Sequence, residues 1–276
     1  MKVALLQMTS GEDPAVNLAV TREMIREAAA NGAGCVMTPE CTNCLSGNRT
    51  HQTTVLRSEA KDPTLAVLQA EAAALGIWLS IGSLALKTED ADGRFANRSF
   101  LIDPNGGVAA SYDKIHMFDV TVSPTETYRE SAAYRPGSRA VVHETPFGTF
   151  GLTICYDLRF AYLHRALAQA GAEVLLVPAA FSAVTGAAHW EPLLRARAIE
   201  TGCYVLAAAQ TGVHYVADGK ERRTYGHSMA ISPWGEVLCD AGLAPCISYV
   251  DIDRAEVANA RGRIAALTHD RPFERP

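Results

Sequence analysis

Apolar residues along this chain recur at two spacings, and these predict strands and helices in turn. Short apolar or alternating runs bounded by glycine, proline or polar residues predict strands, whereas apolar positions three or four residues apart predict helices. The predicted strands cover residues 3–8, 35–37, 77–86, 95–102, 108–112, 141–145, 149–154, 173–178, 204–209, 225–231, 237–240 and 247–252. The predicted helices cover residues 14–31, 64–75, 158–170, 187–201 and 254–261.

The order of these elements predicts an α/β fold. Helices fall between strands along the whole chain, and the strands outnumber the helices. A single sheet of so many strands is unusual, so we expect sheet packed on sheet with helices outside. The chain has no low-complexity linker, heptad run or short-period repeat, which favours one domain over residues 1–276.

Two segments lack a clear period. Residues 41–52 are polar and irregular, as expected of a loop at the rim of a site. Residues 119–137 show neither a helix nor a strand pattern, and loops of that length are usually functional or disordered. Because this stretch contains Tyr128, Tyr134 and the pair Arg129–Glu130, we expect it to be an ordered lid or wall.

Composition and charge narrow the possible partners. The 276 residues are 48% hydrophobic and 20% charged, as in an ordinary globular protein, and the formal net charge of −5 argues against a nucleic-acid-binding surface. Lys220, Arg222 and Arg223 form a short basic cluster that we expect to be a solvated loop. Gln7 interrupts the apolar residues near Met1, and no stretch approaches the roughly 18 apolar residues of a membrane span. We therefore expect neither a secretory signal nor a membrane partner.

The seven cysteines show no disulfide-framework spacing, which indicates a reducing compartment and a cytoplasmic protein. Cys41 and Cys44 form a C-x-x-C, with Cys35 before it and His51 after it. A structural zinc site needs a second ligand pair, and none stands at a recognisable spacing. We expect packing and loop cysteines here, with no metal site and no cofactor.

Cys155 is the candidate nucleophile. It follows the predicted strand 149–154 and precedes an apolar helical pattern, so it lies where a strand becomes a helix. The first turn of a helix has unpaired N–H groups and the positive end of the dipole, which favour a thiolate, the reactive form of cysteine. The alternative is a small buried hydrophobe, the usual role of a free cysteine.

Glu40 and Lys114 are candidates for the same site because each also follows a predicted strand. Either residue alone is more often a solvated charge. Together with Cys155 they supply the nucleophile, the base and the positive group that hydrolysis of a carboxamide requires. In this scheme Lys114 stays protonated, and the backbone N–H of Tyr156 is a second donor to the oxyanion.

These residues lie in segments that resemble the glutamate, lysine and cysteine motifs of the nitrilase superfamily of carbon–nitrogen hydrolases. The resemblance covers essentially the whole chain, and within the superfamily it points to the Nit branch and its deaminated glutathione amidases. The matching segments are Thr38–Glu40, Tyr112–His116, Leu152–Phe160, His189–Glu191, Arg195–Thr201 and Tyr225–Met229.

The resemblance implies a four-layer α-β-β-α sandwich, a thioester acyl-enzyme, no metal, and a homodimer or larger homo-oligomer. It implies that Glu130 is a second glutamate that supports Lys114 and the substrate. By motif position, Arg159, Phe181 and Thr185 would line the substrate pocket. A guanidinium can hold the carboxylate of a 2-oxo acid in bidentate fashion, although an ion pair with Asp157 is the alternative role of Arg159.

The leading hypothesis is an amidase that cleaves a small ω-amide such as deaminated glutathione through a Cys155 thioester, with release of ammonia. An ω-amidase acting on 2-oxoglutaramate and an N-carbamoyl amide hydrolase stay open within the same class. The residues Ala161–Tyr162 stand where family members often have Pro-Glu, which affects the pocket rather than the three central residues.

Three alternatives belong to other classes. One is a non-catalytic binding or scaffold protein with the same fold, and another is a metal-dependent hydrolase, which chelators would inactivate. The third is a papain-like Cys/His enzyme. We expect His116, His189 and His227 to be hydrogen-bonded structural residues, which disfavours that third alternative.

Overall fold

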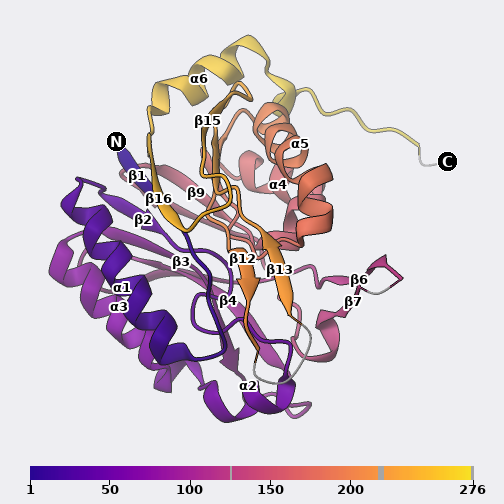
Figure 1. Ribbon diagram of the computed structural model, residues 1–276. Coiled ribbons are helices and arrows are strands. Elements are labelled where there is room, and N and C mark those ends of the chain that lie inside the picture. The colour runs from indigo at the N-terminus through magenta and orange to yellow at the C-terminus, as the bar shows by residue number, and fades with distance from the viewer. Residues whose placement is uncertain (125, 217–220, 275–276) are drawn as a thin grey trace.

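Two sheets packed face to face, with helices on their outer faces, make up the computed structural model, which describes residues 1–124, 126–216 and 221–274 (Figure 1). Within these residues each sheet has six strands. The first sheet has the order β16 (Cys246–Asp251), β1 (Lys2–Gln7), β2 (Cys35–Met37), β3 (Trp78–Lys87), β4 (Phe95–Ile102) and β5 (Val108–Asp113). The second has the order β15 (Val237–Asp240), β14 (Met229–Ile231), β11 (Tyr204–Ala207), β10 (Val174–Leu176), β9 (Gly148–Leu152) and β8 (Val141–Thr145).

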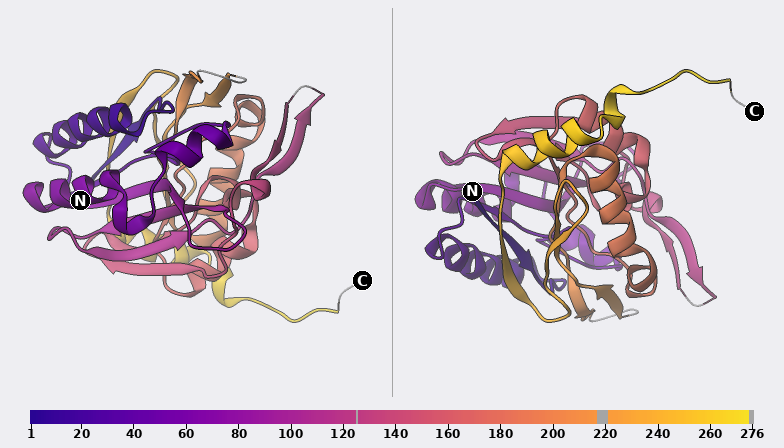
Figure 2. Two further views of the ribbon diagram at one scale, coloured as in Figure 1. Left: turned by 90° about the horizontal axis from the view of Figure 1, so that it is seen from below. Right: turned by 90° about the horizontal axis from the view of Figure 1, so that it is seen from above.

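The helices form the two outer layers of the sandwich. In the views of Figure 2, α1 and α3 cover the first sheet, while α4 and α5 cover the second. The described helices are α1 (Pro14–Ala30), α2 (Arg49–Val55), α3 (Pro63–Leu75), α4 (Ala161–Gln169), α5 (Ala183–Thr201) and α6 (Arg254–Arg263). The arrangement is the predicted α-β-β-α sandwich.

Strand β1 shows how alternation in the sequence builds these layers. Val3 and Leu5 pack into the core between the two sheets, together with residues of β9, β10 and β11. Ala4 and Leu6 point to the opposite face and pack against α1 and α3, where Ile25 lies. Because successive side chains of a strand alternate between faces, a strand covered on both sides is apolar throughout.

Local signals account for several element boundaries. The side chain of Asp13 caps α1, with Pro14 at the first helical position, and Asp62 caps α3 in the same way. Gly76 ends α3 with a left-handed φ of 64°, a conformation that glycine adopts without a steric penalty. These boundaries agree with the predicted helices 14–31 and 64–75 to within one residue.

Other predictions need correction. Residues 119–137 contain a two-stranded hairpin, β6 (Asp119–Ser123) and β7 (Glu126–Arg129), which projects from the body of the molecule (Figures 1 and 2). Residues 41–52 line part of the pocket described below, as predicted for the rim of a site, but residues 41–45 are buried and α2 begins at Arg49. The predicted strand 225–231 is divided between β13 (Arg222–Tyr225) and β14, because Gly226 and His227 have positive φ. Strand β13 pairs with β12 (Thr211–His214).

The two ends of the fold meet in the first sheet. Strand β16 pairs antiparallel with β1 over the whole of β1, and the N-terminal amine of Met1 donates to the Ile252 carbonyl at 2.8 Å. Beyond β16, α6 lies across the end of the sandwich (Figure 1). Within the described ranges, no helix combines the length and apolar character that a membrane span requires.

Candidate active site

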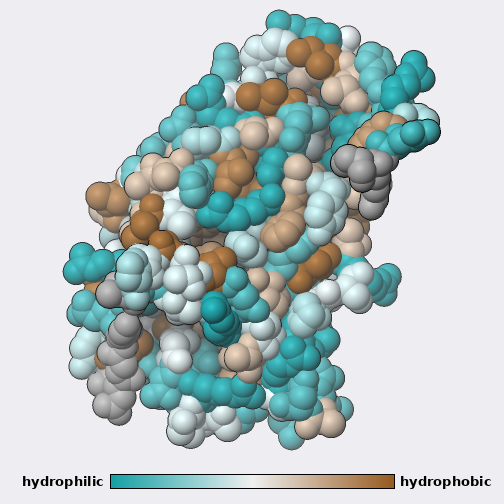
Figure 3. Space-filling model, turned by 90° about the vertical axis from the view of Figure 1, so that its right-hand side faces the viewer, coloured by the Kyte–Doolittle hydropathy of each residue, from teal (hydrophilic) through white to brown (hydrophobic). Residues whose placement is uncertain are grey.

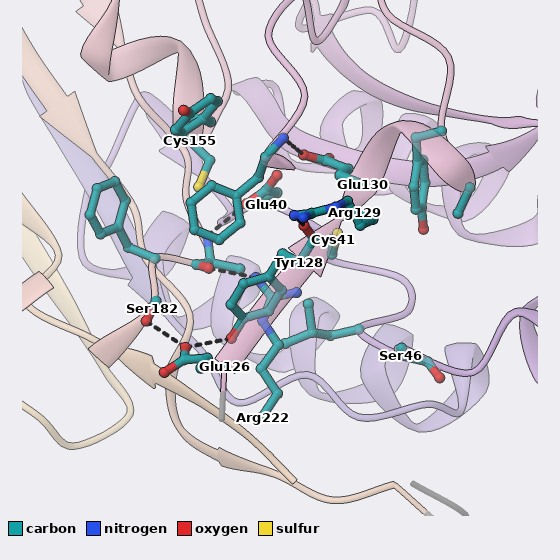
Figure 4. A pocket seen from close by; sticks show the side chains of 18 of the residues that line it. Glu40, Cys41, Ser46, Glu126, Tyr128, Arg129, Glu130, Cys155, Ser182 and Arg222 are labelled. Carbon is teal, nitrogen blue, oxygen red and sulfur yellow. Dashed lines mark hydrogen bonds between the residues drawn. The ribbon is translucent and has the colours of Figure 1, made fainter. Parts of the chain in front are cut away.

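Loops that follow strands of both sheets enclose a pocket of about 1110 Å³. Glu40 follows β2 and Lys114 follows β5 in the first sheet, whereas Cys155 follows β9 in the second. Glu130 comes from the short 3₁₀ turn after hairpin β6–β7. The fold therefore brings together all four residues for which a catalytic role was predicted, and Figure 4 labels Glu40, Glu130 and Cys155 among them.

Lys114 is the centre of a buried charge cluster. Its Nζ atom lies 2.9 Å from Glu40 Oε1 and 2.9 Å from each carboxylate oxygen of Glu130. The Lys114 side chain is 2% exposed, and the side chains of Glu40 and Glu130 are 4% and 14% exposed. A buried ammonium ion is tolerated when opposite charges and hydrogen bonds replace its hydration, as they do here.

Each carboxylate of the cluster is also fixed by other donors. Glu40 Oε2 accepts from the backbone N–H of Ala180 at 2.8 Å, and Glu40 Oε1 accepts from Asn97 Nδ2 at 2.9 Å. Glu130 Oε2 accepts from the backbone N–H of Phe118 at 2.6 Å. These contacts hold the carboxylates in place, because rotation of either would leave buried donors unpaired.

Cys155 lies on a strained turn directly beside Glu40. Its φ of +49° is rare for a residue with a side chain, and its backbone N–H donates to the Pro178 carbonyl at 2.9 Å. In Figure 4 the sulfur atom points into the pocket towards Glu40. The strained backbone thus directs the thiol towards the charge cluster.

Asp157 holds this turn in position. It is fully buried, and its Oδ2 atom accepts from the backbone N–H of Ile154 at 2.9 Å and from the hydroxyl of Tyr112 at 2.6 Å. Its Oδ1 atom lies 3.0 Å from the backbone N of His116, which donates to it, and 2.6 Å from Nδ1 of the same residue. The Cys155 turn is therefore attached to the loop that carries Lys114.

The cluster determines the ionisation of the thiol. Burial and the Glu40 carboxylate raise the pKa of Cys155 well above its ordinary value, and Lys114 opposes this only in part. Burial would also raise the pKa of Glu40, but Lys114, with smaller contributions from Arg222 and Cys155, lowers it to about 2. Burial acts to lower the pKa of Lys114, yet Glu130 and Glu40 raise it well above its usual range.

The expectation that the helix start favours a thiolate is therefore wrong. Only a 3₁₀ turn, Cys155–Arg159, precedes α4, and burial together with an adjacent carboxylate outweighs any dipole effect. At neutral pH the site consists of a thiol, a carboxylate and an ammonium ion.

The remaining predicted residues occupy different places. Tyr156, Phe181 and Thr185 line the pocket, and the buried Oγ1 of Thr185 has no hydrogen-bond partner among the described residues. Arg159 stands outside the described lining, with both terminal nitrogens 3.3 Å from Nδ1 of His189 and its guanidinium over the rings of Tyr156 and Phe181. It forms no ion pair with Asp157 in the described part of the chain, so its substrate role stays a prediction.

Asn97 and Arg222 are among the pocket residues that sequence reasoning missed. Asn97 donates to both carboxylates of the cluster, and a polar side chain within the apolar strand 95–102 was the available signal. Arg222 was expected in a solvated loop, but it lines the pocket and its Nη2 donates to the Ala180 carbonyl at 2.7 Å. Lys220, the first residue of that basic cluster, lies outside the described residues, and Arg223 is exposed.

The three histidines that we expected to be structural make hydrogen bonds to neighbouring side chains. Cys41 and Cys44 are buried free thiols, and no group of three or more His, Cys, Asp or Glu residues in the described ranges is placed to hold a metal ion. The described lining of the pocket includes no histidine, and His227 lies 2.8 Å from Asp240. This arrangement disfavours a papain-like Cys/His pair.

Comparison with known proteins places the chain in a family. Residues 2–262 match the carbon-nitrogen hydrolase family model. The deaminated glutathione amidase of Yersinia enterocolitica is 41% identical over 274 residues, which cover 98% of this chain and 92% of that protein.

Solved structures share the fold. The C. elegans NitFhit protein has a TM-score of 0.90 at 36% identity over 98% of this chain, which spans 65% of the NitFhit chain. A mutant of the amidase from Nesterenkonia sp. AN1, with acrylamide added at its active-site cysteine, has a TM-score of 0.78 at 26% identity, covering 96% of this chain and 98% of that one. The chain belongs to the carbon-nitrogen hydrolase family.

Proposed function

We propose that this protein is an amidase that hydrolyses deaminated glutathione, with Cys155 as the nucleophile. The observation that carries the proposal is the Cys155 thiol beside the buried cluster of Glu40, Lys114 and Glu130 at one end of a large pocket. The 41% identity to the deaminated glutathione amidase of Yersinia enterocolitica supports the substrate.

In the first step the Cys155 sulfur attacks the amide carbon while the thiol proton moves to Glu40. Because the pKa of the thiol is raised and that of Glu40 is lowered, the proton transfer accompanies C–S bond formation rather than preceding it. The carbonyl electrons become an alkoxide, which the Lys114 ammonium and the Tyr156 N–H stabilise. Glu130 keeps Lys114 charged and oriented through two contacts of 2.9 Å.

In the second step the C–N bond breaks as Glu40 returns the proton to the departing nitrogen, which leaves a Cys155 thioester. Water then attacks the thioester carbonyl while Glu40 takes its proton, and Glu40 passes that proton to the Cys155 sulfur as the C–S bond breaks and the acid product leaves. One carboxylate thus acts as base and then as acid in each half of the reaction. Its hydrogen bonds to Ala180 and Asn97 keep it in one position through these steps.

The nitrogen product depends on the substrate. A primary amide such as 2-oxoglutaramate releases ammonia. Deaminated glutathione instead releases cysteinylglycine, because its amide nitrogen belongs to that dipeptide, so the ammonia release expected from the sequence applies to primary amides alone. The cavity of about 1110 Å³ slightly exceeds the roughly 300–1,000 Å³ common for small-molecule sites, so it has room for a dipeptide. An assay of this substrate should follow 2-oxoglutarate rather than ammonia.

Replacing Cys155 by Ala tests the nucleophile. We expect hydrolysis of deaminated glutathione to fall about 10⁴-fold or more, since the attacking atom is removed. Cys239→Ala, which changes a cysteine of β15 outside the described lining, is the matched control and should keep full activity. Quenched wild-type reactions should contain an acyl group on Cys155, seen as added mass on the peptide that carries it.

Turnover by Cys155→Ala would disprove the nucleophile. A wild-type enzyme that cleaves 2-oxoglutaramate or an N-carbamoyl amide but not deaminated glutathione would disprove the substrate. Inactivity on the whole panel would instead favour a non-catalytic binding protein.

We also propose a homo-oligomer and a cytoplasmic location. Exposed apolar residues on the outer helices, Tyr162 of α4 and Val184 and Ile199 of α5, are candidates for a subunit interface. Figure 3 shows apolar residues interspersed with hydrophilic ones on the side of the molecule where these helices lie. Seven free cysteines fit a reducing compartment, and the contribution of both sheets to one pocket supports a single domain over residues 1–276.

A further inference from the structure

Arg222 is a positive side chain of the pocket that forms no ion pair within the described residues. It lies on β13, and its Nη2 atom donates to the Ala180 carbonyl at 2.7 Å. Its guanidinium carbon lies 5.7 Å from the centre of the Tyr128 ring. Its Nε atom is buried and has no hydrogen-bond partner within the described residues. A buried donor without a partner is costly unless a ligand satisfies it.

Three of the four carboxylates in the described pocket lining already have partners, and the fourth, Glu221, is exposed. Glu40 and Glu130 bind Lys114, and Glu126 accepts hydrogen bonds from the Tyr128 hydroxyl and from Ser182 Oγ, at 2.7 Å and 2.8 Å. Arg222 itself has no ion pair within the described ranges. By contrast, the buried Arg197 does form an ion pair, with Glu200 at 2.9 Å. Arg222 is therefore suited to an anionic group that comes from outside the chain.

The residue Ala180 shows which end of a substrate would reach Arg222. The Ala180 N–H donates to Glu40 Oε2 at 2.8 Å, and the Ala180 carbonyl accepts from Arg222 Nη2. Arg222 thus lies beside the carboxylate that, in the proposed mechanism, delivers a proton to the departing nitrogen. Both residues line the same pocket, so a group attached to that nitrogen can extend from Glu40 to Arg222 (Figure 4).

We propose that Arg222 binds a carboxylate on the leaving amine, so that the enzyme selects amides of small anionic peptides over primary amides. This inference rests on the proposed function and names the half of the substrate that sets specificity. In deaminated glutathione this carboxylate belongs to glycine, the second residue of the cysteinylglycine leaving group. A planar guanidinium with a free Nε offers it a bidentate contact through Nε and a terminal nitrogen.

Three substrates and two variants test the proposal. The substrates are deaminated glutathione, its glycinamide analogue, which lacks only the terminal carboxylate, and 2-oxoglutaramate, which has no dipeptide. Wild-type kcat/KM should be about tenfold to a hundredfold higher for deaminated glutathione than for its glycinamide analogue. The difference should lie mainly in KM, because the charged pair is remote from the reacting atoms. In Arg222→Gln this ratio should fall to within about threefold of one.

Arg223→Gln is the matched control because it removes the same charge from the next residue of β13, whose side chain is exposed at the border of the same pocket. It should keep the wild-type ratio. Any loss that Arg222→Gln causes by changing Glu40 affects all three substrates equally, so it cancels in the ratio.

Equal kcat/KM of the wild-type enzyme for acid and glycinamide overturns the proposal, even if Arg222→Gln does not fold. An Arg222→Gln ratio as large as that of wild type also overturns it. Failure of the proposed function looks different, because the wild-type enzyme would then hydrolyse none of the three substrates.

Discussion

Lys114 connects residues that are far apart in the sequence but in contact in the fold. It neutralises two carboxylates that would otherwise repel each other in a buried pocket, and its charge opposes the rise in the pKa of Cys155. The sequence indicated Glu40, Lys114 and Cys155 by their motifs and by their positions after strands. It did not indicate that the thiol would stay protonated, since that depends on burial and on the distance to Glu40.

We predict that Lys114→Gln destabilises the protein as well as inactivating it. The change leaves Glu40 and Glu130 as neighbouring buried carboxylates without a counter-ion, and removal of one partner of a buried pair costs about 3–5 kcal/mol. Urea unfolding of the variant and of the wild type at pH 7 measures the loss.

Glu130→Gln is the control for that prediction, because it keeps the ion pair between Glu40 and Lys114 and should lose less stability. A Lys114→Gln variant that unfolds at the wild-type urea concentration would show that the cluster contributes little to folding.

At the scale of elements, the site depends on how closely loops of the two sheets approach. Gly82 of β3 lies at this contact: a Cβ atom there would be 2.1 Å from the carbonyl oxygen of Thr38 and 2.5 Å from Cβ of Pro178. Thr38 begins the segment that carries Glu40, and the Pro178 carbonyl accepts the Cys155 N–H. The strands were predictable from apolar periodicity, but this approach was not, because no local pattern encodes a contact between two sheets.

We predict that Gly82→Ala separates the loops that carry Glu40 and Cys155. The added methyl group overlaps backbone atoms that cannot move independently, so we expect a loss of about 1–3 kcal/mol in stability and a larger proportional loss of kcat. Thermal unfolding and steady-state kinetics measure both effects. Gly262→Ala in α6 is the control, since a Cβ atom there meets no atom within 4 Å and alanine favours a helix. Equal effects of the two changes would contradict the explanation by steric overlap at Gly82.

At the scale of the whole molecule, two sheets with helices outside enclose a dry core and place a charged site at its edge. The apolar alternation of β1 predicted such layers, and pairing of β16 with β1 joins the two ends of the described fold. Hairpin β6–β7 escaped prediction because its strands are short and have exposed positions, so they show no apolar pattern. It is stabilised by pairing between its two strands and supplies one wall of the pocket.

The buried site should make stability depend on pH at both extremes. The pKa of Glu40 is about 2 in the fold and about 4.5 without it, so its contribution is complete above pH 4.5 and disappears as the pH falls towards 2. The pKa of Cys155 is raised above the ordinary 9.0, so the unfolded thiol ionises first and stability declines as the pH rises past about 9.

Urea midpoints of wild type and Cys155→Ala at pH 7 and pH 10 test the alkaline half of this prediction. The urea midpoint of wild type minus that of Cys155→Ala should be smaller at pH 10 than at pH 7. An unchanged difference would mean that the folded and unfolded thiols ionise alike.

The sequence by itself determined the alternation of helices and strands, the layered fold and the residue types at the centre of the site. These follow from local spacing and from motifs, which need no knowledge of distant neighbours. Only the tertiary structure decided that Cys155 is a neutral thiol, that Arg222 borders the pocket instead of solvent, and that Asn97 joins the two carboxylates. The reason is physical: burial and Coulomb interactions depend on separations in space, and those separations exist only once the two sheets have packed together.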